Sequence, residues 1–345
     1  MIIIRGEVST QSGLQTLPQV QVMPVRIAIE RRLPQDSEQM VAMRERLIEI
    51  CQNYLDSGFG DGNAEQRLCS PDDFTYYQQL SEVLLAHQLT TAGIDFTHQA
   101  IGPDFCINHN GRRIWIEVIA PTPANIPEAW LSATDGVREF PHEAILLRWT
   151  AAIKQKAEVL LGNLPGANGY LANGIVGPRD CYVIAINGRL LRGLGGALQA
   201  LIGISQFPFA VEATFAVGPL QVRINRETLE ASEPEHQQRY LIHKPVGQPV
   251  PADTFLDPRF APISAIWAVD IDEFAVMDLP ARMVVVHNPN AINPLPVGFL
   301  PAQDEYVASV IDARTYRLDR VEGRTLRPVE NLVTVGVHHP PCSNC

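Results

Sequence analysis

The chain has 345 residues, of which 46% are hydrophobic and 19% charged, a composition typical of a globular protein. We expect no membrane span, because no run approaches the roughly 18 uncharged apolar residues that one requires. The net charge of −11 argues against nucleic-acid binding over a broad basic surface, but not against a local basic groove. The first residues lack the pattern of a signal peptide, and six scattered cysteines favour reduced thiols, so we expect a cytoplasmic protein.

Two amphipathic helices are expected before residue 95. The first runs from Gln35 to Leu55, where apolar residues recur at helical spacing, and a Gly/Asp/Asn-rich stretch at 57–63 ends it. The second begins at Ser70-Pro71, a serine cap followed by proline in the first turn, and runs to about Thr91.

Strands dominate the prediction for the rest of the chain, with one further helix. A short strand at 94–100 precedes a hairpin at 103–120, and a helix is expected from about Glu143 to Leu161. The continuous apolar run within 180–187 is typical of a fully buried strand. Further short strands are expected at 209–215, 220–224, 263–269 and 283–286. This order of elements predicts an α/β protein.

The hairpin brings two acidic residues together. Asn110-Gly111 lies between two β-rich runs and predicts a two-residue type I′ turn, because both positions then need a positive φ. Counting outward from that turn places Asp104 opposite Glu117, with Cβ atoms roughly 5 Å apart on one face of the sheet. Both faces of the hairpin are largely apolar, so the two carboxylates are expected to be buried.

Two readings account for such a pair, because buried carboxylates without partners are costly. In one reading, an arginine such as Arg113 or Arg148 neutralises them. In the other, which we favour, they bind a divalent cation, Mg²⁺ or Mn²⁺, through hard oxygen ligands.

These residues resemble the PD-(D/E)xK superfamily, which has the restriction-endonuclease-like fold. The resemblance covers residues 70–190 and consists of Gly-Pro-Asp-Phe at 102–105, the hairpin, Trp-Ile-Glu at 115–117, the following helix and the buried strand. It implies a mixed central sheet flanked by helices, with Asp104 and Glu117 as metal ligands. Glu82 on the preceding helix and the main-chain carbonyl of Val118 would complete the ligand set.

The sequence departs from this family at the catalytic lysine. The expected position, two residues after Glu117, is occupied by Ile119, which cannot polarise a phosphate or a water molecule. Some family members supply the lysine from the next helix, where Arg148 and Lys156 fall on one stripe and Lys154 about 160° away. We therefore expect Lys156 to be the migrated catalytic lysine, with Arg148 and Lys154 as candidates for phosphate contacts. The alternative is that both lysines are solvated surface residues.

The resemblance divides the chain into an N-terminal accessory helical segment (1–65), a nuclease-like core (66–190) and a β-rich, proline-rich C-terminal extension (191–345) packed on that core. His-Asn-Pro at 287–289 and Asn-Pro-Leu-Pro at 293–296, with the segments above, also resemble uncharacterised bacterial proteins that have such a core and extension. The function implied is Mg²⁺-dependent phosphodiester hydrolysis, with DNA or RNA as the substrate. The alternative is a catalytically inactive nuclease fold used to bind nucleic acid or protein.

Two further segments carry weaker signals. The glycine-rich loop Gly193–Gly196 follows a buried strand, which is the context for phosphate binding at a helix N-terminus and would make the chain a nucleotide-binding α/β enzyme. It lacks the spacing of known nucleotide motifs, however. His338, His339, Cys342 and Cys345 have ligand types suitable for zinc, although a proline-bearing tail of this kind is more often disordered.

Overall fold

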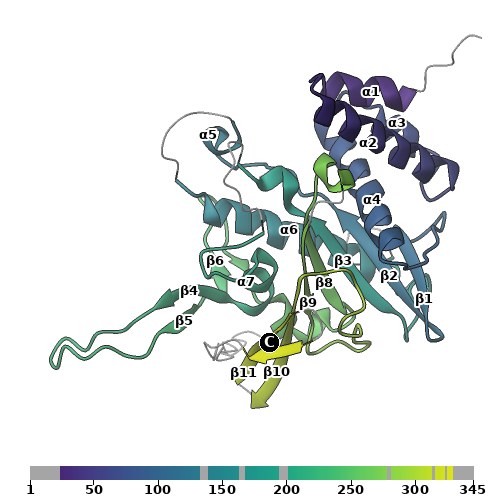
Figure 1. The fold of residues 1–345 in the computed structure, drawn as a ribbon. Helices are drawn as coiled ribbons and strands as arrows, with labels where there is room; N and C mark the ends of the chain where they lie inside the picture. The colour runs from purple at the N-terminus through teal and green to yellow at the C-terminus, as the bar shows by residue number, and fades with distance from the viewer. Residues whose placement is uncertain are drawn as a thin grey trace, which may run out of the picture.

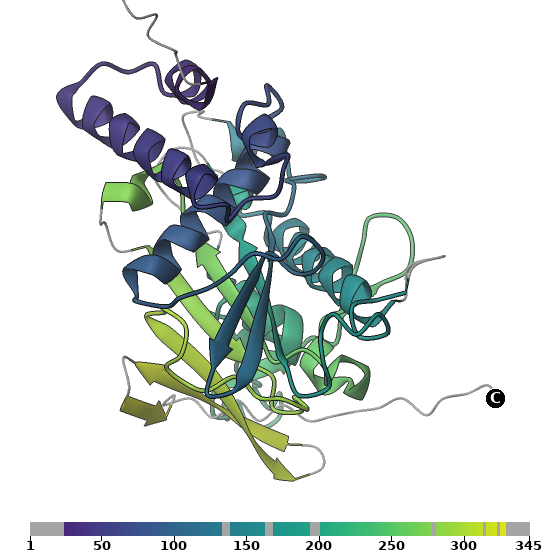
Figure 2. The same ribbon diagram turned by 90° about the vertical axis from the view of Figure 1, so that its right-hand side faces the viewer.

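We describe a computed structural model of the chain, comprising residues 24–132, 139–162, 168–193, 201–277, 281–312, 315–322 and 325–328. It is a mixed α/β protein built on one large sheet, seen in two orientations in Figures 1 and 2. No helix within these ranges is both long and apolar enough to cross a bilayer.

The described residues form an eight-stranded mixed sheet in the order β1-β2-β3-β8-β9-β10-β11-β12. Strands β2, β3 and β8 are mutually parallel, and β9 pairs with β10 in parallel, whereas the other neighbours are antiparallel. The strand bounds are β1 Phe105–His109, β2 Arg112–Ile119, β3 Cys181–Asn187, β8 Ala265–Asp270, β9 Arg282–His287, β10 Asp304–Asp312, β11 Thr315–Glu322 and β12 Thr325–Pro328. Strands from both sides of residue 191 therefore belong to one sheet.

Helices cover the two faces of this sheet and create two hydrophobic cores. One core lies under α1 (Pro24–Arg32), α2 (Glu38–Asp56), α3 (Ala64–Leu68) and α4 (Asp73–Thr91), and includes Ile116 of β2. The other core lies under α6 (His142–Leu161) and α7 (Phe209–Phe215), and includes Trp115 of the same strand. Successive residues of β2 thus point to opposite cores, as the alternation predicted.

Smaller elements lie outside the main sheet. The short helix α5 (Glu128–Leu131) follows β2. Two separate hairpins are formed by β4 (Val217–Gln221) with β5 (Glu235–Gln238), and by β6 (Leu241–Ile242) with β7 (Val250–Pro251). The β4–β5 hairpin projects from the body as a long arm, on the same flank as α5, α6 and β6 (Figure 1).

Several predicted elements are confirmed to within a few residues. The predicted helices correspond to α2, α4 and α6, and the buried strand corresponds to β3. The segments 263–269 and 283–286 correspond to β8 and β9, and the predicted strand at 220–224 overlaps the end of β4. The N-cap of α4 is Asp72 rather than Ser70, because the Asp72 carboxylate accepts the Thr75 N–H at 2.8 Å.

Two strand predictions are wrong. Segment 209–215 is the helix α7, in which all seven residues are buried. A short apolar run does not distinguish a buried strand from a buried helix, and here the contacts with α6 decide. They include a 2.5 Å side-chain contact between Glu212 Oε2 and His142 Nε2. Segment 94–100 contains only an isolated bridge, between Thr97 and Cys106.

Candidate active site

The hairpin register places Asp104 beside the end of β2. Asn110 and Gly111 have φ values of 50° and 76°, and Phe105 pairs with Ile116, as the two-residue turn predicted. Asp104 lies one residue beyond this last pair. Its Oδ2 accepts the main-chain N–H of Val118 at 2.6 Å, which fixes the carboxylate against the strand that carries Glu117.

Lys156 of α6 reaches the second carboxylate. Its Nζ lies 2.6 Å from Glu117 Oε1, and the two side chains are only 16% and 8% exposed. The other oxygen, Glu117 Oε2, is buried and accepts no hydrogen bond from the described residues. Lys154, in contrast, is 71% exposed and lies 3.7 Å from Glu158. The two lysines therefore point to different sides of α6, as expected from their helical spacing.

Glu82 of α4 is the third carboxylate at this site, and two glutamines on the same helix hold it. Gln79 Nε2 donates to Glu82 Oε2 at 2.9 Å, and Gln78 Nε2 lies 3.5 Å from the other oxygen. Gln78 also links α4 to the end of β2, because its Oε1 accepts the Ala120 N–H at 2.8 Å. Its Nε2 lies 3.4 Å from the Val118 carbonyl.

Burial has the largest effect on the pKa values of the three carboxyl groups at this site. It raises the pKa of Glu117 to about 7, although Lys156 and the nearby Tyr170 hydroxyl oppose the rise. Burial, reinforced by repulsion from Asp104, raises the pKa of Glu82 to about 8. Burial likewise raises the pKa of Asp104 against the opposing effect of Lys156.

Lys156 stays protonated at this site. Burial acts to lower its pKa, but attraction to Glu117 and Asp104 outweighs burial and raises the pKa. The site thus contains one firmly held positive charge and three carboxyl groups that resist ionising together.

The observed contacts do not support the interpretation that an arginine neutralises Asp104 and Glu117. Arg113 pairs with Asp180 at 2.7 Å and lies over the Trp115 ring. Arg148 donates to Thr122 Oγ1 at 2.9 Å, and its buried Nε has no partner among the described residues. Neither guanidinium pairs with Asp104 or Glu117, so a lysine, not an arginine, provides the cation there.

Sequence reasoning missed the residues that support these carboxylates. Gln78 and Gln79 precede Glu82 by four and three residues, a spacing that places all three on one side of a helix and could have indicated the contact. Arg67 offered no such local signal, because it approaches from α3, where its Nε donates to Gln79 Oε1 at 2.6 Å.

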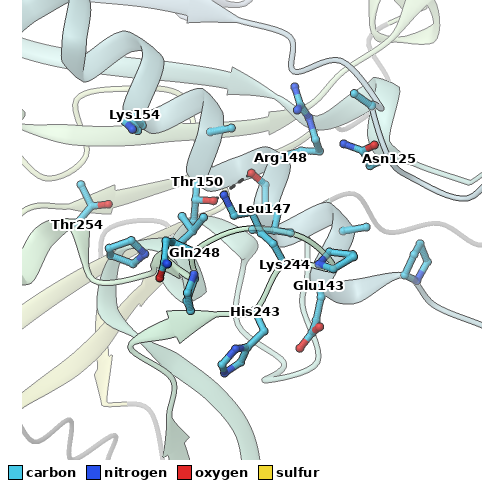
Figure 3. A pocket seen from close by; sticks show the side chains of 18 of the residues that line it. Asn125, Glu143, Leu147, Arg148, Thr150, Lys154, His243, Lys244, Gln248 and Thr254 are labelled. Carbon is cyan, nitrogen blue, oxygen red and sulfur yellow. Dashed lines mark hydrogen bonds between the residues drawn. The ribbon is translucent and has the colours of Figure 1, made fainter. Parts of the chain in front are cut away.

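A separate groove of about 1540 Å³ lies along the outer side of α6 (Figure 3). Arg148 and Lys154, the two candidates for phosphate contacts, line this groove, whereas Asp104, Glu117 and Lys156 do not. In Figure 3 the groove lies between α6 and the segment that carries His243 and Lys244. Lys154 and the acidic site are therefore on different sides of one helix, and Arg148, although on the stripe of Lys156, contributes to the groove.

The acidic site has oxygen atoms that suit a divalent cation. Within the described ranges, no three His, Cys, Asp or Glu side chains form a ready-made metal site. Mg²⁺, however, commonly uses one or two carboxylates and keeps several waters. Glu117 Oε2, buried without a hydrogen bond and near Asp104, is the kind of oxygen that a cation would satisfy. The residues present therefore fit a Mg²⁺-like ion held mainly by two carboxylates.

The cluster at 338–345 lies outside the described residues, as does most of the glycine-rich loop at 193–196.

No family model, curated protein or solved structure matches this chain. The geometry of the site is therefore the basis for any functional conclusion.

Proposed function

We propose that the chain is a metal-dependent phosphodiesterase, most simply a nuclease, whose core has the restriction-endonuclease-like arrangement. The observation that carries the proposal is the 2.6 Å contact between Lys156 Nζ and Glu117 Oε1, beside Asp104. Two acids and a lysine at one buried point are the groups that phosphodiester hydrolysis needs.

In this proposal, Asp104 and Glu117 would hold Mg²⁺ or Mn²⁺, with the Val118 carbonyl as a further candidate donor and water at most of the other positions. Glu82, which Gln78 and Gln79 hold, does not complete a three-carboxylate site within the described residues. The bound cation would lower the pKa of a water molecule and offset charge that develops on the phosphate. Lys156 stays protonated, so it donates hydrogen bonds to the attacking water or to a phosphate oxygen and does not remove a proton.

The other polar groups of the site hold the carboxylates in position. Asp104 is held by the Val118 N–H, and Gln78 ties Glu82 to the end of β2 through the Ala120 N–H. These contacts keep the carboxylates in place before substrate arrives, which lowers the reorganisation needed during the reaction. The side chain of Ile119, at the family's usual lysine position, takes no part.

A cleavage assay tests the proposal. Labelled single- and double-stranded DNA and RNA are incubated with the full chain in Mg²⁺, Mn²⁺ or EDTA. Lys156→Met and Glu117→Gln should each reduce cation-dependent cleavage by at least ~100-fold, as expected for loss of a group that stabilises charge in the transition state. Lys154→Met is the matched control and should retain activity, because Lys154 is exposed on the other side of α6.

The controls separate the possible outcomes. Cleavage that survives Glu117→Gln would show that the activity comes from another site or from a contaminant. If no substrate is cleaved but Mn²⁺ raises the melting temperature of the wild type and not of Asp104→Asn, the site binds a cation without hydrolysing these substrates. That result would favour the inactive, binding form of the fold. Absence of both cleavage and cation-induced stabilisation would refute the proposal.

A further inference from the structure

The β4–β5 arm has one polar side and one apolar side. On its polar side, Arg223 lies 2.7 Å from Glu235 and Gln221 lies 3.4 Å from the same carboxylate. On its apolar side, Leu220, Val222 and Ile224 occupy alternate positions and are 42%, 49% and 64% exposed. Alternate residues of an extended strand share a face, so these three side chains form a stripe along the arm.

An exposed apolar side chain also lies at the tip of the arm. Leu229 is 77% exposed and has a φ of 59°, which is uncommon for a residue other than glycine, asparagine or aspartate. The turn is nonetheless well formed, because the Leu229 N–H donates to the Asn225 carbonyl at 2.8 Å and the Asn225 N–H donates to the Glu230 carbonyl at 2.9 Å. The tip therefore presents a leucine to solvent in a defined position.

A two-stranded hairpin with an exposed apolar side is expected to pack against another surface. Isolated hairpins are marginally stable in water, and contiguous exposed apolar stripes commonly mark interaction sites. The arm carries two arginines and four glutamates between residues 217 and 238, which disfavours a nucleic-acid backbone as its partner. A protein surface with an apolar floor and available cations is a better match.

The groove along α6 offers such a surface (Figure 3), and α6 lies on the same flank of the molecule as the arm (Figure 1). Its volume of about 1540 Å³ exceeds the roughly 300–1,000 Å³ of small-molecule sites, which favours a polypeptide occupant. Leu147, Ala151 and Val246 contribute apolar lining. The groove is also lined by acidic residues, of which Glu143, Glu158 and Asp257 pair with Arg239, Lys154 and Arg259, while Glu139 and Asp253 line it as well. Arg148 and Lys244 line the groove without an ion pair to a carboxylate in the described part of the chain.

We propose that the chain forms a dimer in which the β4–β5 arm of each copy lies in the α6 groove of the other. The groove would receive Ile224 and Leu229, with Arg148 and Lys244 near the tip glutamates Glu227 and Glu230. The arm and helix α6, which lines the groove, lie on one flank in Figure 1, so a two-fold axis makes the exchange reciprocal. Stable interfaces bury roughly 800 Å² per partner, which is more than a stripe of three side chains provides, so the proposed dimer requires both arms and both grooves.

Light scattering coupled to size exclusion, over a range of concentrations, measures the mass of the full chain and its variants. The wild type should have twice the mass of the chain. Ile224→Ser combined with Leu229→Asn should weaken dimerisation at least ~100-fold, because two apolar anchors are lost. These residues are 64% and 77% exposed, and asparagine tolerates the left-handed backbone at 229, so folding should be retained. Gln237→Ser, at an exposed polar position on β5, is the matched control and should leave the dimer unchanged.

A groove variant identifies the surface that receives the arm. Ala151→Glu, at an exposed position on α6, should also give monomers, since it places bulk and negative charge where the arm lies. A mixture of the arm variant with Ala151→Glu should recover dimers, because each mixed pair keeps one intact arm and one intact groove. A monomeric wild type would overturn the proposal, as would a dimer unaffected by either variant. Dimers that need the arm but tolerate Ala151→Glu would show that the arm packs elsewhere.

Discussion

Replacing Glu82 by glutamine should make the metal-free protein more stable at neutral pH and have little effect in acid. The Glu82 carboxyl is buried beside Asp104, and both effects raise its pKa from the usual 4.5 to about 8. Between these two values the folded protein retains a proton that the unfolded chain has released. The free energy of unfolding of the wild type therefore falls as the pH rises through this interval.

The size of the effect follows from the two pKa values. One pKa unit corresponds to about 1.36 kcal/mol, so the difference between 4.5 and about 8 gives an upper limit of about 5 kcal/mol above pH 8. At pH 7 the corresponding figure is about 3 kcal/mol, and at pH 5 it is below about 1 kcal/mol. Glutamine lacks the ionisable proton but keeps an oxygen that can accept the hydrogen bond from Gln79 Nε2.

Urea denaturation in EDTA, at pH 5 and pH 7, measures this difference directly. Glu82→Gln and the wild type should unfold at similar urea concentrations at pH 5, and the variant should be the more stable protein at pH 7. Glu65→Gln, at an exposed position on α3, is the control and should change stability by less than about 0.5 kcal/mol at both pH values. An equal difference between Glu82→Gln and wild type at the two pH values would refute the reasoning.

Two further predictions concern the hairpin and the thiols. Gly111→Ala should destabilise the protein by about 1 kcal/mol, because φ at this residue is 76°, whereas Gly62→Ala should not, since Gly62 has no such φ and open space for a Cβ. Thermal unfolding measures both, and equal losses would contradict the turn assignment. A thiol reagent followed by peptide mapping should label Cys69 well before Cys51, whose burial raises its pKa to about 12. Early labelling of Cys51 would show that α2 opens readily.

Local signals in the sequence predicted the hairpin well. Asn110-Gly111 determines a turn type through its backbone requirements, and the turn then determines which residues face each other. Helix periodicity likewise placed Lys156 and Lys154 on different sides of α6, and the structure adds the 2.6 Å contact of Lys156 with Glu117. These predictions depend on residues that are close in sequence or related by one turn.

Interactions between distant segments were not predictable in this way. Segment 209–215 reads as a strand by its composition, yet it becomes α7 through burial against α6 and the contact of Glu212 with His142. Arg67 reaches Gln79 from another helix, and no spacing in the sequence encodes that approach. Helix α1 and strands β11 and β12 were missed because charged residues interrupt their apolar ones, whereas β10 was missed although residues 306–311 are largely apolar.

The carboxylates and the lysine of the candidate site belong to different layers of the protein. Asp104 and Glu117 are fixed by the hairpin, whereas Lys156 belongs to α6, which packs against β2 and β3 and buries Trp149 and Ile153 in the core on that side of the sheet. The Tyr182 hydroxyl on β3 donates to the Lys156 carbonyl at 3.3 Å, so it anchors the helix at that residue. The distance between the Lys156 ammonium group and the two carboxylates therefore depends on how α6 packs on the sheet. An uncharged substitution beneath α6 would alter that separation without replacing any ionisable residue.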